Sequence, residues 1–476
     1  MLTALKVLEI RQYSCGLSSC NHKILLEDPQ IFPMNTSSKT VREKEENMAA
    51  NNKKKKASSG GFMKVFVGEG RNGDISLSFF AYVMILLVVG LVMMSSASYA
   101  WAYSEHDGDG LFYAKSQAKN AVIGFAAMIF FMKMDYHNLK NIRLPFLKKF
   151  NIAGILYILG AVLLGLVLII GVDEGGAMGA KRWLALGPMS FQPSEVAKLA
   201  IIIFFAYSME RDGKKMNDFK TGILKYAVLM GIYAALLYLE PHLSGLILIG
   251  TISVSMVLCG GANRKQFLLL GSSALAAAII VIAWQANVEG SYVAVRIQSW
   301  KDPFADVLNE TWQTANSVIA IGSGGLFGLG LGNSRQKYLY LPETKNDFVF
   351  PIVCEELGFV GAMAIIIVFF LLVVEGYSIA VRCKDRFGML IAVGITTQIG
   401  IQTVLNLAVV SNMIPNTGIS LPFFSFGGTA LIMQLAEMGI MLNISQQRYY
   451  PRKKSASKRK KQRRDEDTGY SEPINA

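Results

Sequence analysis

Long apolar runs without charged residues constrain this chain more than any other feature of its sequence. The segments 75–100 and 152–172 are each long enough to cross the ~30 Å hydrocarbon core of a bilayer, since a helix rises ~1.5 Å per residue. Over the whole chain, 52% of the residues are hydrophobic and only 17% are charged. A soluble protein of this length needs a charged surface, so the sequence predicts a polytopic membrane protein.

About ten apolar segments of this kind follow one another along the chain. They cover residues 75–100, 117–134, 152–172, 193–209, 223–239, 242–260, 266–286, 347–379, 387–410 and 423–443. We therefore expect an all-α fold of about ten transmembrane helices. A large extracytoplasmic loop, at about 287–346, separates the seventh helix from the eighth. Its aromatic and apolar content favours short amphipathic helices on the outer face of the bundle over disorder.

The Lys and Arg residues of the short connections predict on which side each loop lies. Basic residues concentrate in the connections 133–149, 211–220, 264–265 and 382–386, whereas the connection 411–421 has none. The positive-inside rule then places the basic loops and both termini in the cytoplasm. We expect three parts: a disordered basic cytoplasmic extension at 1–74, the transmembrane domain at 75–446 and a basic cytoplasmic tail at 447–476.

The net charge of +13 excludes little by itself, because the basic runs 53–56 and 452–464 flank the membrane domain. Attraction to anionic lipid headgroups explains such runs, and no nucleic-acid partner is expected. The five cysteines and four histidines show no metal-ligand or disulfide spacing. The sequence contains no ATP-binding loop and no Ser-His-Asp set, so it predicts no metal site and no certain cofactor.

Ionisable residues within apolar segments need partners, because an isolated charge in a bilayer is costly. Glu195 and Lys198 lie about one helical turn apart, and mutual neutralisation is the favoured interpretation. Glu355 and Glu356 are adjacent and face different sides of one helix, so at least one should meet a cation or a cavity. Glu437 lies in the last segment, and the sequence names no partner for it.

The first of three clusters on the outer side has the sequence GAKRWLALGPMSFQPSE, at 179–195. It places Lys181, Arg182 and Trp183 near the outer membrane surface. Two cations beside an aromatic ring could bind a pyrophosphate and a sugar face. The same residue types also serve as ordinary interfacial anchors, and the residues alone do not separate these two roles.

The second cluster, YLYLPETKNDFVFPIVCEELG at 338–358, places Asp347 where the outer loop meets the next helix. This carboxylate could cap the helix, or partial burial could raise its pKa and make it a general base. The third cluster, PNTGISLPFFSFGG at 415–428, has no charge and is rich in Pro, Gly and Ser. Irregular backbone at membrane depth packs on protein or lines a cavity, which favours the wall of a site.

These clusters, together with GLVMMSSASYA at 90–100, GLFGLGLGNSRQKYLYLPE and LIMQLAEMGIMLNIS, resemble the SEDS family of shape, elongation, division and sporulation proteins. The resemblance covers about 75–443, and the opening segment and LPFFSFGG are closer to FtsW and SpoVE than to RodA. It implies a peptidoglycan glycosyltransferase that polymerises lipid II on the outer face of the bacterial cytoplasmic membrane for septal wall synthesis. The implied partners are a class B penicillin-binding protein, which is a transpeptidase, and other division proteins.

Residue by residue, the resemblance assigns the general base to Asp347. The residues that it implies for substrate binding are Lys181, Arg182, Trp183, Arg296, Glu240, Lys345 and Ser425. The leaving pyrophosphate would be received by cations such as Lys181, Arg182 and Arg296, or by a divalent cation, Mg or Mn.

This chain departs from the family's usual residues in three places. Lys345–Asn346 stands where the family usually has His-Thr, His242 replaces the Asp of Glu-Pro-Asp, and Phe426 replaces the Tyr of Ser-Tyr-Gly-Gly. Two alternative functions are a lipid II flippase, which needs a substrate path across the membrane, and a non-catalytic scaffold for the penicillin-binding protein at the division site.

Overall fold

The computed structural model describes residues 74–141, 151–172, 182–186, 189–269, 271–272, 284, 288, 292–307 and 311–447. Its first half contains α3 (Leu77–Glu105), α4 (Phe112–Lys133), α5 (Asn138–Asn141), α6 (Ile152–Ile170), β1 (Leu184–Leu186), β2 (Met189–Phe191), α7 (Pro193–Asp212), the 3-10 helix η3 (Gly213–Asn217) and the π-helix η4 (Phe219–Leu224). Its second half contains α8 (Lys225–Leu239), α9 (Leu243–Cys259), α11 (Tyr292–Lys301), α12 (Trp312–Ser323), α13 (Val349–Arg382), α14 (Arg386–Val410) and α15 (Gly428–Gln446).

The helices coincide with the predicted apolar segments, apart from 266–286, which lies largely outside the described residues. The last helix begins at Gly428 rather than at 423, because the LPFFSF stretch stays irregular as the third cluster predicted. The predicted terminal extension and tail also lie outside the described part. The one departure from helices among the described elements is the antiparallel pair β1–β2, within the first cluster.

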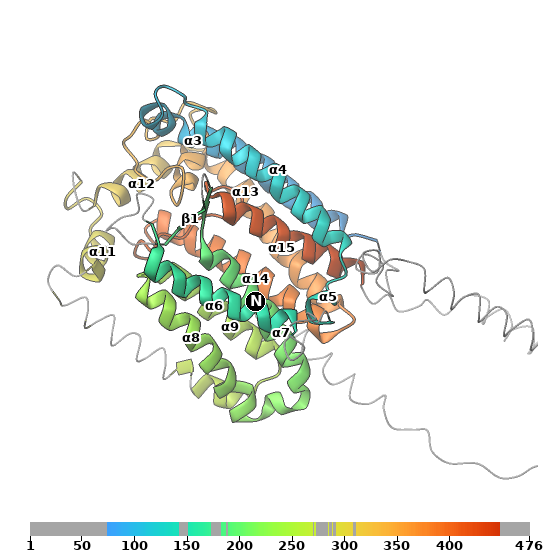
Figure 1. The fold of residues 1–476 in the computed structure, drawn as a ribbon. Coiled ribbons are helices and arrows are strands. Elements are labelled where there is room, and N and C mark those ends of the chain that lie inside the picture. The colour runs from blue at the N-terminus through green and yellow to red at the C-terminus, as the bar shows by residue number, and fades with distance from the viewer. Residues whose placement is uncertain are drawn as a thin grey trace, which may run out of the picture.

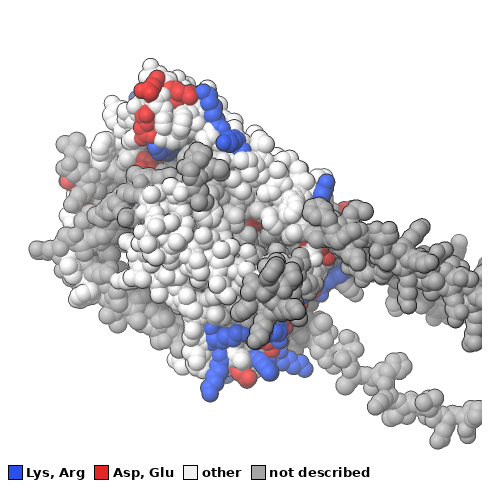
Figure 2. All heavy atoms as spheres, viewed as in Figure 1, with Lys and Arg blue, Asp and Glu red and all other residues white. Residues whose placement is uncertain are grey.

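Five of the described helical stretches are long and apolar enough to cross a membrane. They are Leu77–Glu105, Ile152–Ile170, Phe219–Leu239, Val349–Arg382 and Arg386–Val410, and Leu243–Cys259 is a shorter apolar helix. Figure 1 shows a bundle of helices with α11 and α12 at one end. On the face seen in Figure 2, charged side chains gather at the two ends and leave a broad uncharged band between them. This distribution is that of a polytopic membrane protein.

Helices α4 and α15 lie side by side along the bundle, and glycines allow their close approach (Figure 1). A Cβ atom on Gly439 would come within 2.4 Å of the Met128 carbonyl oxygen, so only glycine fits there. Small residues at such contacts are typical of helices that pack inside a membrane. Near one end of the pair, the Asn443 amide donates to the Met132 carbonyl oxygen at 2.7 Å. Near the other end, the Gln117 amide donates to the Ser425 carbonyl oxygen at 3.1 Å.

Helix α13 is broken at Gly358, whose backbone (φ 69°, ψ −171°) is not helical. The glycine-rich loop 324–337 packs into this break. Backbone N–H groups of Leu329 and Gly330 donate to the carbonyl oxygens of Glu355 and Glu356 at 2.9 and 3.0 Å. The break therefore exposes helix carbonyl groups, and the loop satisfies them.

The adjacent carboxylates Glu355 and Glu356 of α13 are buried and have partners in this loop. The Glu356 carboxylate pairs with the Lys337 ammonium at 3.0 Å and accepts the Ser96 hydroxyl at 2.7 Å. The Glu355 carboxylate accepts the Ser334 hydroxyl at 2.5 Å and the Arg335 backbone N–H at 3.1 Å. The expectation that at least one of the two carboxylates meets a cation is confirmed.

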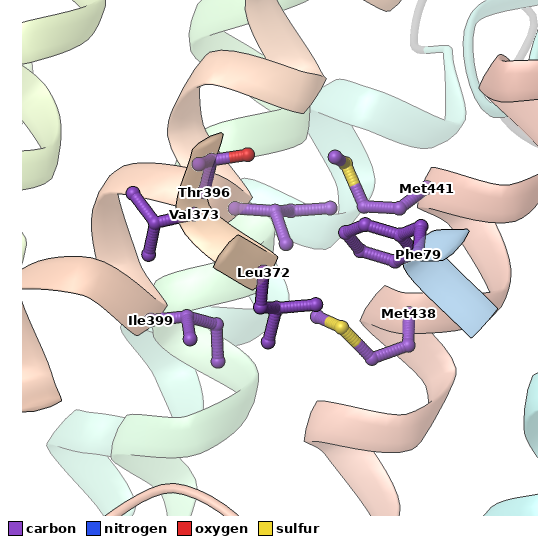
Figure 3. Close-up of a pocket in the computed structure, with 8 residues that line it drawn as sticks. Phe79, Leu372, Val373, Thr396, Ile399, Met438 and Met441 are labelled. Atoms are coloured by element: carbon purple, nitrogen blue, oxygen red, sulfur yellow. The ribbon is translucent and has the colours of Figure 1, made fainter. Parts of the chain in front are cut away.

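The core between α3, α13, α14 and α15 contains a small void (Figure 3). Its walls are Phe79, Leu372, Val373, Ile395, Thr396, Ile399, Met438 and Met441. The volume open to a water-sized sphere is about 10 Å³, no more than one water needs, and the lining is almost wholly apolar. This void is a packing defect rather than a ligand site.

The seating of the glycine-rich loop predicts unequal effects for two Gly→Ala changes. Gly328→Ala places a Cβ 2.2 Å from the Glu356 carbonyl oxygen, at a φ of +79°. We expect it to lower the free energy of unfolding by about 1–3 kcal/mol more than the control does. The control is Gly325→Ala, at a φ of +54° with no atom within 4 Å of the added methyl group. Thermal unfolding in detergent measures both, and an equal loss would contradict the close loop–helix contact.

Candidate active site

The second cluster holds Asp347 through contacts with α3. The Thr344 hydroxyl donates to the Ala97 carbonyl oxygen at 2.9 Å, and the Trp101 indole N–H donates to the Leu341 carbonyl oxygen at 3.4 Å. Asp347 then directly precedes Phe348, the N-cap residue of α13. The start of α13 and the end of α3 thus fix the backbone of Asp347 from two sides.

The helix-capping alternative for Asp347 is wrong. The N-cap position of α13 is Phe348, and no side chain caps the helix there. On the other side, the Asn406 amide of α14 donates to the Asp347 carbonyl oxygen at 2.8 Å and to the Ile419 carbonyl oxygen at 2.6 Å. A Cβ atom on Gly418 would lie 3.3 Å from Asp347 Oδ2. The third cluster therefore forms a wall beside this carboxylate, as its composition predicted.

The environment of Asp347 raises the pKa of its carboxyl group to about 6, from 3.8. Burial is the main cause, and the Glu343 carboxylate adds to it, while the guanidinium groups of Arg182 and Arg296 act in the opposite direction. A general base works best when its pKa is close to the working pH. The structure thus supplies a carboxylate that can accept a proton near neutral pH.

The first cluster brings Arg182 to this site from the strand β1 side. Its guanidinium donates to the Pro241 carbonyl oxygen at 2.6 Å, and its Nε is buried without a hydrogen-bond partner. Pro241 lies in the turn between α8 and α9, beside Glu240 and His242. Both neighbours are buried, and Glu240 Oε1 and His242 Nδ1 also have no partner among the described residues.

The two neighbours of Arg182 are neutral at pH 7. Burial raises the pKa of Glu240 to about 8, against the opposing effect of Arg182. Burial, together with the charges of Arg182 and Lys198, lowers the pKa of His242 to about 3. Because neither carries a charge, the positive charge of Arg182 is not cancelled by the side chains of this turn. An uncompensated guanidinium beside a carboxylate base is suited to receive an anionic leaving group.

Two further residues that the sequence analysis assigned to the site, Arg296 and Trp183, are also described by the structure. Arg296, on α11, donates to the carbonyl oxygen of Asn416 in the third cluster, and the Asn416 amide donates to Gln313 of α12 at 2.8 Å. The predicted loop helices therefore exist and lie over the third cluster. Trp183 forms an antiparallel bridge with Val172 at the end of α6. Lys181 lies outside the described residues.

Lys345 and Ser425 make structural contacts within the site. The Lys345 ammonium pairs with the Glu105 carboxylate at 2.9 Å and contacts Tyr113, and the Lys345 carbonyl oxygen accepts the Phe426 N–H at 2.7 Å. The Ser425 hydroxyl accepts the Leu421 N–H at 2.7 Å. The Lys345–Phe426 bond joins the second and third clusters, and the Ser425–Leu421 bond closes a turn within the third, so both residues shape the site.

Sequence reasoning missed a stripe of amide side chains on α14. Gln398, Gln402 and Asn406 recur at i, i+4 and i+8, so they lie on one face of the helix. Each uses its NH₂ group as a donor, and each leaves its side-chain carbonyl oxygen buried without a partner. The i+4 spacing was visible in the sequence. The spacing alone did not indicate a site, because amide side chains in an apolar helix usually form hydrogen bonds to a neighbouring helix.

The buried charges of α7 and α15 lie near the inner end of this stripe. The Lys198 ammonium pairs with the Glu195 carboxylate at 2.8 Å, which confirms the predicted pairing. The Glu437 carboxylate, whose partner the sequence did not name, accepts the Gln398 amide at 3.0 Å. Glu437 also lies within electrostatic range of Lys198. Lys198 is also within electrostatic range of His242, so charged and polar groups continue from the turn at 240–242 to Gln398.

The protonated state of Glu240 predicts a pH-dependent stability. An acid with a raised folded pKa binds more protons in the folded chain, so wild-type stability should fall as the pH rises from about 4.5 to about 8. Glu240→Gln removes this titration. We expect the melting temperature of the variant to exceed that of the wild type by a margin that grows over this range and then stays constant. Thermal scans between pH 5 and 9 measure the margin, and a constant difference would refute the neutral state.

The sequence profile of the FtsW/RodA/SpoVE family, described as cell cycle protein, matches residues 76–450. The stage V sporulation protein E of Bacillus subtilis (strain 168) is 37% identical over 368 residues, 77% of this chain and 96% of the relative. A protein named probable peptidoglycan glycosyltransferase FtsW, from Geobacter sp. (strain M18), is 35% identical over 76% of this chain and 94% of its own length.

Two solved structures share the fold. One, described as structural coordination of polymerization and crosslinking by a peptidoglycan synthase complex, superposes with a TM-score of 0.64 at 26% identity. It covers 79% of this chain and 98% of the solved chain. The other is the rod shape determining protein RodA of Thermus thermophilus, with a TM-score of 0.56 and 25% identity over 79% of this chain and 98% of that one.

Proposed function

Since the chain belongs to the FtsW/RodA/SpoVE family of membrane proteins, we propose that it is a peptidoglycan glycosyltransferase that polymerises lipid II. One observation carries the mechanism. Asp347 is a half-buried carboxylate with a raised pKa, flanked by Arg182 and Arg296, whose charges oppose that rise. Glycosyl transfer from a lipid pyrophosphate needs a general base and, beside it, positively charged groups that bind the leaving pyrophosphate.

In the proposed step, a carboxylate oxygen of Asp347 accepts the proton of the acceptor sugar 4-hydroxyl. The freed oxygen forms a bond to the anomeric carbon of the donor sugar. The bond from that carbon to the lipid pyrophosphate breaks, and its electron pair leaves with the pyrophosphate. Holding the two sugars in line is itself a large part of the rate gain.

The pyrophosphate gathers negative charge as it leaves, and Arg182 is placed to receive it because its neighbours Glu240 and His242 are neutral. Arg296, which donates to the Asn416 carbonyl oxygen of the third cluster, adds a second guanidinium. The described residues include no group of three or more His, Cys, Asp or Glu side chains that could hold a metal. A divalent cation, Mg or Mn, would find the carboxylates of Glu343 and Asp347 within electrostatic range of each other, and with the pyrophosphate as a further ligand it would supply positive charge there.

The proposed topology places this site on the outer face of the cytoplasmic membrane. It has about ten spans and cytoplasmic termini, supported by the basic connections at the end of the bundle opposite Asp347. A solved relative is described as a peptidoglycan synthase complex that coordinates polymerization and crosslinking. By analogy, we infer that a class B penicillin-binding protein crosslinks the glycan that this chain makes. We also infer that this chain acts in septal wall synthesis together with other division proteins.

Asp347→Asn should abolish polymerisation while leaving the protein folded. The amide cannot accept the hydroxyl proton, and loss of a general base costs about 10²–10⁴-fold in rate. Because an ionised Asp347 is costly where it lies, the melting temperature should stay equal or rise. Incubation of the purified chain with labelled lipid II, followed by resolution of glycan length, measures the activity.

Three other outcomes would redirect the assignment. Glycan synthesis by Asp347→Asn would show that Asp347 is not the base. A wild-type chain that moves lipid II headgroups across vesicles without new glycosidic bonds would be a flippase. A chain with neither activity that still binds the penicillin-binding protein would be a scaffold.

The rate of polymerisation should fall as the pH drops below about 6, because Asp347 becomes protonated. Glu343→Gln removes a negative neighbour that raises the pKa of Asp347, so it should move this acidic limb to lower pH. The Gln side chain keeps an oxygen that can accept the Asn346 amide, which lies 2.6 Å from Glu343 Oε2. Initial rates between pH 4.5 and 8 test this, and a shift toward higher pH would contradict the arrangement.

A further inference from the structure

A second polar site lies at the end of the bundle opposite Asp347. It is a cavity of about 730 Å³ between α6, α7 and the η4–α8 junction, which is within the size range of small-ligand pockets. Helix α7 runs from the first cluster to this cavity over 20 residues, about 30 Å. The cavity is therefore separate from the proposed active site, and the inference below does not depend on the glycosyltransferase assignment.

The inner wall of the cavity is apolar and aromatic. Tyr157 and Ile158 of α6, Phe204 of α7, and Val228 and Leu229 of α8 line it. The Tyr157 hydroxyl donates to the Leu229 carbonyl oxygen at 2.7 Å, which fixes the distance between α6 and α8 on one side of the opening. Ile158 and Val228 are 48% and 57% exposed, so the cavity continues onto the apolar outer face of these helices. An apolar ligand portion could therefore extend into the bilayer.

The mouth of the cavity is cationic. Arg211, Lys220 and Lys225 line it, and no carboxylate is among the lining residues. The Lys225 ammonium is bonded to the Asp212 carboxylate and the Ser208 hydroxyl, both at 2.6 Å. Arg211 and Lys220 are exposed and make no ion pair within the described part of the chain. Figure 2 shows Lys and Arg gathered at this end of the molecule.

An irregular turn holds these cations beside the apolar wall. The chain leaves α7 through η3 and enters α8 through the π-helix η4, which carries Lys220. A Cβ atom on Gly222 would come within 1.8 Å of the Met216 carbonyl oxygen, so this tight turn requires glycine. Single π-turns are rare and occur often at functional sites.

We propose that this cavity binds one anionic phospholipid. Its phosphate lies between Arg211, Lys220 and Lys225, and an acyl chain follows Ile158 and Val228 toward the bilayer. The apolar wall and the cationic mouth together select the ligand. A soluble phosphate would leave the apolar wall in water. A zwitterionic lipid would bring a second cation to a mouth whose nearby carboxylate, Asp212, is already paired with Lys225. Basic pockets between helices at the cytoplasmic side bind anionic headgroups in this way.

The test compares two double variants of the full chain that remove the same charge. Arg211→Gln with Lys220→Gln changes the cavity mouth, and Lys214→Gln with Lys215→Gln changes exposed cations of η3 that do not line the cavity. Each purified protein is titrated with phosphatidylglycerol, with phosphatidylcholine and with glycerol phosphate. Bound lipid is counted by native mass spectrometry, and the melting temperature is followed in parallel.

We expect one phosphatidylglycerol to bind the wild type and raise its melting temperature, with affinity lowered at least 10-fold in the cavity variant and less than 2-fold in the control. Equal losses in the two variants would show non-specific attraction and overturn the proposal. Phosphatidylcholine binding as tightly as phosphatidylglycerol, or glycerol phosphate matching the lipid, would also overturn it. If the double variant does not fold, Lys220→Gln alone is compared with Lys215→Gln, and equal affinities would then refute the site.

Discussion

Two adjacent carboxylates inside a long apolar helix impose the constraint on which the outer half of this structure depends. Glu355 and Glu356 cannot remain unpartnered in a bilayer, and their partners come from Lys337 and Ser334 of the glycine-rich loop. The loop can reach them only because α13 breaks at Gly358. Once the loop is seated, the segment that follows it must leave beside α3 and return to the start of α13. That path sets the position of Asp347.

The chemistry of the site follows from which groups are left charged. Burial keeps Glu240 and His242 neutral at pH 7, so Arg182 faces the site with its charge available. Burial also raises the pKa of Asp347, while the nearby guanidinium groups limit that rise. The result is a base and an anion site that do not cancel each other by forming a direct ion pair. The sequence departures at positions 242 and 345 are tolerated because His242 is uncharged and Lys345 pairs with Glu105.

The sequence predicted the helices well where an apolar run of bilayer length left no alternative, and it predicted the pairing of Glu195 with Lys198 from their spacing on one helix. Tertiary contacts were out of its reach. Gln398 and Glu437 lie on different helices, and nothing local joins them. The third cluster was correctly interpreted as a wall, because its composition disfavours a helix. The residues that it packs against, such as Asp347 and Arg296, lie far from it in the sequence, so the sequence could not name them. Two alternatives for Asp347 had equal support until the N-cap of α13 proved to be Phe348.

The amide stripe of α14 has a consequence for the rigidity of the site. Every NH₂ group of the stripe is already used, and its three side-chain oxygens are buried without a partner among the described residues. Through its NH₂ group, Asn406 ties the backbone of Asp347 and that of Ile419 to the same turn of α14. The carboxylate and the wall beside it are thereby anchored to one helix, so neither can shift without breaking a hydrogen bond to the buried Asn406 side chain.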